Sequence, residues 1–249
     1  MSSDRLVKIV IVCSLLLIAV AWLMSERLPA PEQLDAAVLE EPDQRPTREK
    51  PFDTKVEGME YRVAPRFTYE ITGLVVSLHD SKAWWDYAHR EWGDHLNVAD
   101  LCVVWGENVR RDAYRRVSYT HTQWECWWSA SSMSPEHAFD STAMSNNHVL
   151  TDDPDVARRL RDVRIGDEVR VRGYLADYTT FKDGAPRGMR KTSIVRTDDG
   201  EGACEVVWVQ ELRIIRSHGR GWRIAGKIGA GLLVLGLIAW ILLPAKLDD

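Results

Sequence analysis

Cysteine and histidine are the residue types in this sequence that most readily carry chemistry. Three of the four cysteines, Cys102, Cys126 and Cys204, lie in the central part of the chain. A cysteine thiol becomes a nucleophile when a neighbouring histidine accepts its proton, and His121 or His148 could serve as that base. Nothing in the sequence brings these groups together, so we do not favour covalent catalysis.

The histidine spacing does not predict a zinc site. The chain contains neither a CxxC motif nor an HxxxH pair, the spacings that commonly supply zinc ligands. His79 with Asp80, His89 and His95 could form a metal site, but histidines in solvated loops are the simpler interpretation. We therefore predict no metal and no other cofactor.

The motifs of the common enzyme families are also missing from the sequence. It contains no GxSxG, HExxH, P-loop or Rossmann glycine pattern, which favours a non-catalytic binding or scaffold module over an enzyme. A cell-wall or glycan-directed hydrolase that uses acids such as Asp94 and Glu107 is the alternative hypothesis.

Tryptophan is concentrated in the middle of the chain, where residues 84–128 contain seven of the 11 indoles. Most should fill the core, because an indole buries a large area. In a strand, however, Trp124 and Trp127 would face opposite ways, so some indoles could instead form a stacking surface for sugar rings or a protein-binding site. The candidate ligand-binding residues are these indoles and a neighbouring polar run: Trp84, Trp85, Trp92, Trp124, Trp127, Trp128, Asn146, Asn147 and His148.

The elements that must position these side chains are predicted to be mostly strands. Residues 129–151 are polar, and residues 179–190 contain glycine and proline, so both stretches are predicted to be loops. Alternating or continuous apolar patterns predict strands at 67–78, 101–105, 117–127, 168–177, 192–196 and 204–215.

Residues 153–177 carry the clearest pattern, a short helix followed by a tight turn and a strand. Asp153 is a suitable N-cap, and Val156, Leu160 and Val163 form one apolar face. The stretch IGDEVRVRGYL resembles the fourth strand of an oligonucleotide/oligosaccharide-binding (OB) barrel, entered from the helix that this fold places after its third strand. The resemblance implies a mainly β fold, a small five-stranded barrel with one helix and long insertions.

Further stretches, LCVVWG, SNNH and RTDDGEGACE, resemble envelope-associated bacterial proteins of unassigned role. The formal net charge of −5 disfavours nonspecific nucleic-acid binding, which normally needs a basic excess. We therefore expect an envelope protein or a glycan as the partner. A cytoplasmic-facing nucleic-acid module is a second alternative.

Cys102 and Cys126 are predicted to form a disulfide, because they fall on the predicted second and third strands, which should be neighbours. Such a bridge would close a loop of about 24 residues and stabilise the fold by about 3 kcal/mol in the chain-entropy model. Cys204 would then be left over.

Residues 7–24 and 228–244 are apolar enough to predict transmembrane helices at both termini. The first fits an uncleaved signal anchor, although its basic start also fits a cleaved signal peptide. Proline and many charges predict that residues 25–55 form an unfolded linker, and basic residues mark 217–227 as a juxtamembrane segment. The folded domain then covers residues 56–216.

The charges beside the two spans give opposite indications of topology. Arg5 and Lys8 favour a cytoplasmic N-terminus, which places the domain outside the bacterial inner membrane. Arg220, Arg223 and Lys227 precede the second span and favour the opposite side. Because the first span usually dominates, we predict two inner-membrane spans and an extracytoplasmic domain, a location that also permits a disulfide.

Overall fold

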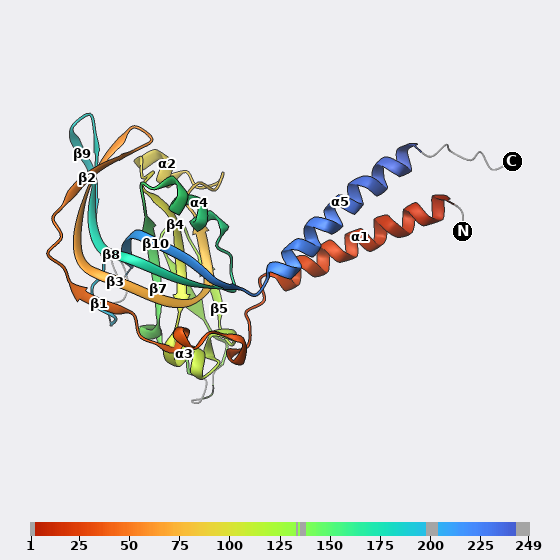
Figure 1. Cartoon of the computed structure of the whole chain (residues 1–249), viewed down its shortest axis with the longest axis horizontal. Helices are drawn as coiled ribbons and strands as arrows, with labels where there is room; N and C mark the ends of the chain where they lie inside the picture. Colours follow the sequence, from red (N-terminus) through yellow and green to blue (C-terminus); the bar gives the residue numbers. More distant parts are fainter. Residues whose placement is uncertain (1–2, 133, 135–137, 198–203, 243–249) are drawn as a thin grey trace. The chain divides into compact units, whose positions relative to one another are not determined.

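The computed structural model describes residues 3–132, 134, 138–197 and 204–242. The chain divides into two compact units: a body, Leu28–Ser217, and a helical pair formed by the two terminal segments (Figure 1). The body is mainly β sheet, as predicted.

The helical pair consists of α1 (Ser3–Ser25) and α5 (Arg220–Leu242), which pack against each other. Both helices are long and apolar enough to cross a membrane, by length and composition. Small residues allow them to approach closely: a Cβ on Gly229 would lie 3.1 Å from Ile18 Cγ1, and one on Gly236 would lie 3.0 Å from Ile11 Cγ1. Glycine is common at such contacts between membrane helices.

Helix α5 begins earlier than the predicted second span. The basic residues that were predicted to form a separate segment at 217–227 therefore belong mostly to its first turns, while Ser217 ends the last strand. Residues 243–244 of the predicted span lie outside the described residues.

Five strands form the centre of the body, and each pairs with two of the others. The pairs β3–β4, β4–β7, β8–β10 and β3–β8 are antiparallel, whereas β7–β10 is parallel. The apolar cluster that includes Leu101, Trp105 and Leu175 packs between them. The five strands are β3 (Met59–Asp80), β4 (Asn97–Val104), β7 (Met144–Leu150), β8 (Asp167–Lys182) and β10 (Glu205–Ser217).

Shorter strands extend this sheet or stand apart from it. Strands β1 (Asp43–Pro46) and β2 (Phe52–Val56) pair with β3, and β9 (Ala185–Arg190) pairs with β8. Strands β5 (Ser118–His121) and β6 (Cys126–Ser129) form a separate two-stranded hairpin.

The helices of the body are short. Helix α4 (Pro154–Asp162) confirms the predicted helix: Asp153 is its N-cap and accepts hydrogen bonds from the backbone of Asp155 and Val156, while Val156 and Leu160 are buried. The other helices are α2 (Ala88–Trp92), α3 (Gly106–Arg110) and the 3₁₀ turns Pro31–Gln33, Ala36–Leu39, Ala113–Arg115 and Ser141–Ala143.

Residues 28–55 are part of the body, so the linker prediction is wrong for them. Val38 is completely buried. The Asp35 N–H donates to Glu168 Oε2 at 2.8 Å, and the Trp105 indole donates to a carboxylate oxygen of Glu41 at 2.9 Å. The composition of this segment predicted an unfolded linker because it ignores tertiary contacts. The segment packs against the sheet, and residues of the sheet form hydrogen bonds with its polar groups.

Four further predictions about local structure are wrong. Residues 129–151 contain the central strand β7, and the stretch 117–127 forms the separate β5–β6 hairpin in place of a third sheet strand. Residues 179–190 belong to the β8–β9 hairpin, and residues 192–196 are not a strand. Polar character misled the prediction for β7, because its polar side chains are buried and hydrogen-bonded mostly to partners outside the strand.

Candidate functional site

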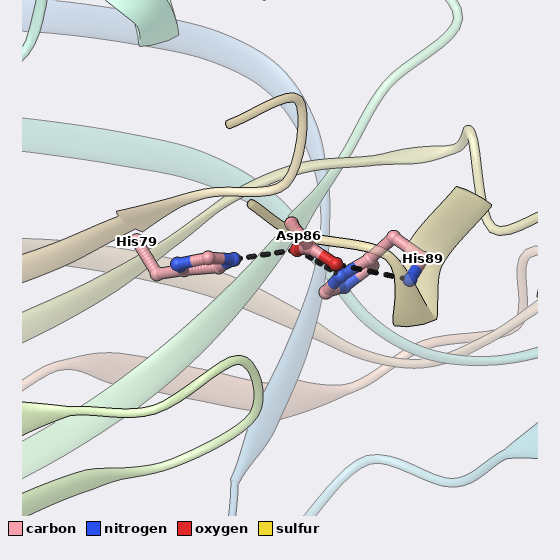
Figure 2. Close-up of side chains that lie close together, drawn as sticks. All are labelled: His79, Asp86 and His89. Atoms are coloured by element: carbon pink, nitrogen blue, oxygen red, sulfur yellow. Dashed lines mark hydrogen bonds and ion pairs between the residues drawn. The ribbon is translucent and has the colours of Figure 1, made fainter. Parts of the chain in front are cut away.

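A buried histidine–aspartate–histidine cluster lies where β3 ends and α2 begins (Figure 2). Asp86 Oδ2 lies 2.6 Å from His79 Nε2 and 2.6 Å from His89 Nδ1. A carboxylate can only accept, so both rings donate to the same oxygen. Burial alone would raise the pKa of Asp86, but the hydrogen bonds from His79 and His89 hold it below its ordinary value.

Asn97 connects this cluster to a second buried carboxylate. Asn97 Nδ2 donates to Asp100 Oδ1 at 2.8 Å and lies 3.2 Å from His89 Nε2. Since an amide nitrogen is a donor, His89 Nε2 must be the accepting nitrogen, which agrees with His89 Nδ1 carrying the proton toward Asp86. The strand β4, on which Asn97 and Asp100 lie, therefore links two polar centres.

His148 forms the second centre together with Asp100. The two residues lie opposite each other in the antiparallel pairing of β4 and β7, and His148 Nδ1 donates to Asp100 Oδ1 at 2.7 Å. Burial would lower the pKa of His148, but the charge of Asp100 and its hydrogen bond raise it to about 9. The same pair holds the pKa of Asp100 at about 2 against the effect of burial.

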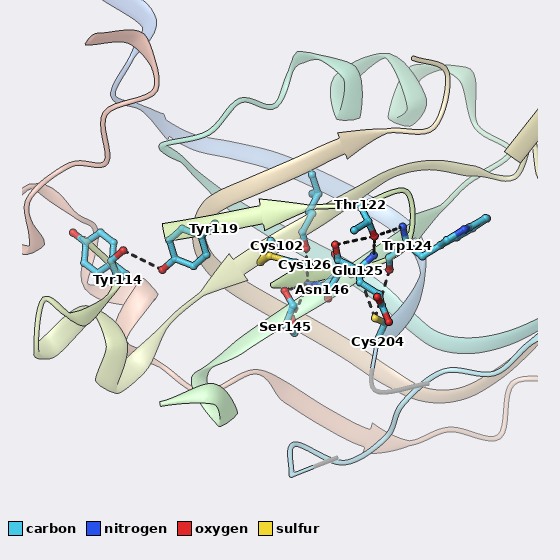
Figure 3. Close-up of a disulfide and its surroundings, with 12 residues drawn as sticks. Cys102, Tyr114, Tyr119, Thr122, Trp124, Glu125, Cys126, Ser145, Asn146 and Cys204 are labelled. Carbon is cyan, nitrogen blue, oxygen red and sulfur yellow. Dashed lines mark hydrogen bonds between the residues drawn. A yellow bond between two sulfur atoms is a disulfide. The ribbon is translucent and has the colours of Figure 1, made fainter. Parts of the chain in front are cut away.

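The free thiol of Cys204 lies beside Asn146 and Trp124 (Figure 3). It donates to the backbone oxygen of Trp124 at 3.8 Å, and Asn146 Nδ2 donates to its Sγ at 3.6 Å. Cys204 immediately precedes β10, whose parallel pairing with β7 sets Val206 beside His148. His148 therefore contacts a carboxylate through one nitrogen and lines the same cavity as the thiol.

His121 lies near both centres without joining either. Its two ring nitrogens are buried and have no hydrogen-bond partner among the described residues. Burial lowers the pKa of His121 to about 4, although the charge of Asp100 opposes this shift. Its ring centroid is 6.2 Å from that of His79.

The first cluster has the donor types of a zinc site. One nitrogen from each of His79 and His89 and one oxygen from Asp86 all lie within 4.8 Å of one another. A cation there would displace the N–H protons of both rings, whereas the contact with Asn97 favours a proton on His89 Nδ1. The observed contacts thus satisfy all three side chains by hydrogen bonding alone.

An aromatic groove lies beside the thiol; we define it by Trp92, Trp124, Met189 and Arg190, which line two adjoining cavities. The indoles of Trp92 and Trp124 are stacked with centroids 5.2 Å apart, and the Arg190 guanidinium lies 4.4 Å from the centroid of Trp124. The larger cavity, of about 640 Å³, is also lined by His148, Cys204 and Lys191.

The structure brings together only part of the predicted ligand-binding set. Trp92, Trp124 and His148 line the larger cavity, and Asn146 contacts Cys204. Trp84 and Trp127 are 86% and 55% exposed and line neither cavity. The remaining three lie elsewhere: Trp85 contacts the His79 ring, Trp128 packs against Phe139, and Asn147 is buried with its Nδ2 bound to Ser145 and Leu101.

Sequence reasoning missed Asp86, Asn97, Asp100 and Arg190, and it placed Cys204 outside any site. A signal for Asp100 was present, because this acid directly precedes the apolar run LCVV and so belongs to a buried strand. A buried acid needs a partner, which points to a neighbouring histidine.

The other sequence hypotheses are not supported by contacts among the described residues. His95 lies near Glu57, and Asp80 accepts from the backbone of Lys82, so neither joins the His79 cluster. Asp94 accepts a hydrogen bond from Tyr178, whereas Glu107 pairs with arginines on its own helix and in the next turn. No described contact joins the two acids proposed for a hydrolase.

Cys102 and Cys126 lie at disulfide-bonding distance, with their sulfur atoms 2.10 Å apart (Figure 3). The predicted pair is therefore found, but its strands are not neighbours in one sheet. Cys102 lies on β4 of the main sheet and Cys126 on β6 of the separate hairpin. The bridge thus fastens to the sheet the hairpin that carries Trp124.

Comparison of this chain with protein-family models, with curated proteins and with solved structures found no match.

Proposed function

We propose that this protein is a membrane-anchored binding module of the bacterial cell envelope, built on an OB-type barrel, with its body on the extracytoplasmic side. The ligand is held in the aromatic groove. The observation that carries this proposal is the combination of stacked indoles, a half-buried arginine and a cavity of about 640 Å³ at one place.

The strand pairing supports the OB-type barrel. The five central strands β3, β4, β7, β8 and β10 are the first to the fifth in chain order. Their pairs β3–β4, β4–β7, β7–β10, β10–β8 and β8–β3 lead back to the first strand. Helix α4 lies between the third and the fourth, as the OB pattern requires. OB folds bind their ligands with the second and third strands and with the loops after the first and fourth strands. Trp92 and Arg190 lie in these two connections.

The groove favours a ligand that combines a ring with an acceptor oxygen. Trp92 is largely exposed and can stack on a sugar ring. Arg190 Nη1 is buried and has no hydrogen-bond partner among the described residues, so an oxygen of the ligand would satisfy it. A glycan that carries a carboxylate meets both requirements.

The extracytoplasmic side is supported by the basic start of α1, where Arg5 and Lys8 lie. It is also supported by the Cys102–Cys126 pair, because disulfides persist in oxidising compartments. The basic first turns of α5 weigh against it and would then contact anionic lipid headgroups.

Tryptophan fluorescence of the full chain in lipid nanodiscs tests ligand binding. Soluble oligosaccharides released from the cell wall should quench or shift the emission of the parent chain. Trp92→Ala should weaken this binding at least fivefold, because the stacking of a nucleic-acid base on an aromatic ring is worth about 1–3 kcal/mol and we expect a similar loss for a sugar ring. Trp127→Ala removes an exposed indole outside the groove and should leave the affinity unchanged. Equal affinities of both variants and the parent for the oligosaccharide would show that the aromatic groove is not the binding site.

A further inference from the structure

The aromatic groove has a second cavity, which the proposed function does not use. Besides the larger cavity, the groove residues line a smaller one of about 420 Å³. Asp94, which follows Trp92 closely in the chain, is also in the wall of this smaller cavity. A ring that stacks on Trp92 would therefore lie close to a carboxylate.

Asp94 is buried, and only one of its carboxylate oxygens has a partner. The residue is 8% exposed. Oδ2 accepts a hydrogen bond from the hydroxyl of Tyr178, whereas Oδ1 is buried and has no hydrogen-bond partner among the described residues. Buried polar atoms are almost always paired, so Oδ1 needs a donor, which a ligand in the cavity would supply.

The charge of Asp94 indicates which donor fits. Burial raises the pKa of Tyr178 well above its ordinary value, so the described partner of the carboxylate is neutral. Arg187 lines the same cavity, but it is exposed and forms no ion pair with Asp94 among the described contacts. A buried carboxylate is costly without a positive partner. A protonated amine supplies both the hydrogen bond and the positive charge, whereas a hydroxyl supplies only the hydrogen bond.

Asp94 and Arg190 together define a ligand with two charges. Arg190 also lines the smaller cavity, and its Nη1, like Asp94 Oδ1, is buried without a hydrogen-bond partner among the described residues. These two atoms therefore do not bind each other, and both remain available to a ligand. A sugar ring on Trp92 that carries a carboxylate and an amine would satisfy both.

We propose that the aromatic groove selects an amino sugar whose amine is free and protonated, and that Asp94 binds this amine in the smaller cavity. The inference rests on the proposed function and deepens it, because the glycan whose carboxylate binds Arg190 then also carries an unsubstituted amine. An acetylated nitrogen is neutral and leaves the charge of Asp94 unpaired, so the acetylated sugar is the ligand that this site rejects.

The test compares two matched sugars that both carry a carboxylate: muramic acid, whose amine is free, and N-acetylmuramic acid. Binding is followed by tryptophan fluorescence of the full chain in lipid nanodiscs at pH 6, where a primary amine is protonated. The parent chain should bind muramic acid at least tenfold more tightly, because hydrogen bonds between charged groups are the stronger ones. This comparison needs no variant, and equal affinities of the parent for the two sugars would overturn the inference.

Asp94→Asn should remove the preference, because the amide still accepts from Tyr178 but has no charge. The matched control is Asp183→Asn, which makes the same change at an exposed residue that lines neither cavity and should keep the preference. Both variants are checked for folding by circular dichroism. A preference that persists in folded Asp94→Asn, or that Asp183→Asn also removes, would overturn the assignment to Asp94.

Trp92→Ala separates this inference from the proposed function. If this variant binds both sugars more weakly than the parent does, but the parent does not distinguish between them, the groove binds the ring and only the amine site is wrong. If Trp92→Ala changes neither affinity, the groove is not the binding site and both proposals fail. If the parent binds neither sugar, the amine site is wrong, and the cell-wall oligosaccharides still test the proposed function.

Discussion

Asp100 lies directly opposite His148 across strands β4 and β7, and its Oδ1 accepts a hydrogen bond from His148 Nδ1 at 2.7 Å. Both side chains are buried, so neither charge is screened by water. This single contact fixes the orientation of the imidazole in the wall of the larger cavity.

The Asp100–His148 pair should make the protein less stable at alkaline pH. The pKa of His148 is about 9 in the folded chain against 6.5 as its ordinary value. Its stabilisation is therefore complete below pH 6.5 and is lost as the pH rises through 9, by up to about 3 kcal/mol. Thermal unfolding followed by near-ultraviolet circular dichroism from pH 6 to 10 measures this loss. Asp100→Asn should flatten the profile, and an unchanged slope in that variant would contradict the assignment.

His121 should reduce stability on the acid side. Burial lowers the pKa of His121 to about 4, so the folded chain resists a proton that the unfolded chain accepts below pH 6.5. Stability should therefore fall between pH 6.5 and pH 4, by about 3 kcal/mol. His121→Phe should melt at a higher temperature relative to the parent at pH 5 than at pH 7.5. If the difference in melting temperature between His121→Phe and the parent is the same at both pH values, His121 does not cause the loss of stability in acid.

Breaking the Cys102–Cys126 bridge should loosen the hairpin that carries Trp124. The bridge spans a sequence separation of 24 residues, and its loss should cost about 3 kcal/mol in the free energy of unfolding. Cys126→Ser should also shift the emission of Trp124 toward that of a solvated indole. Cys13→Ser, which changes a cysteine outside the body, provides the control and should alter neither quantity.

A substitution at Val38 tests whether residues 28–55 are folded or form a flexible tether. Because Val38 is completely buried, Val38→Ala should lower the free energy of unfolding by about 2 kcal/mol. The matched control is Val195→Ala, since Val195 is about half exposed and should tolerate the change. Equal free energies of unfolding for the two variants would indicate that residues 28–55 are a linker.

The side of the membrane can be tested together with the redox state of the cysteines. Protease added to spheroplasts should cleave the body, and thiol labelling without reductant should modify Cys204 but spare Cys102 and Cys126. Labelling of those two should require prior reduction. A protected body in which all three thiols are labelled would place it in the cytoplasm.

Local patterns in the sequence predicted the elements that local physics determines. The cap at Asp153 and the apolar positions Val156 and Leu160 identified α4, and alternation identified the first half of β8. The terminal helices followed from composition. The strand β7 could not be predicted, because the burial of Asn147 and His148 depends on partners on other strands.

The candidate site was predicted only in part for the same reason. Tryptophan content pointed to Trp92 and Trp124, but not to the groove that Arg190 completes from a hairpin far along the chain. Asp86 and Asp100 resemble ordinary surface acids in the sequence. Their role becomes visible only when the fold places histidines beside them: strand pairing does so for Asp100, and the connection from β3 to α2 does so for Asp86.

The close contact of α1 and α5 at Gly229 and Gly236 has a thermodynamic consequence for the body between them. While the two helices remain packed, an unfolded body is still a closed loop from Leu28 to Ser217. Closing a loop of this length removes chain entropy equivalent to about 5 kcal/mol in the same model that applies to disulfides. The two terminal helices therefore act as a noncovalent crosslink, and a single cut between α1 and the body should release that stabilisation.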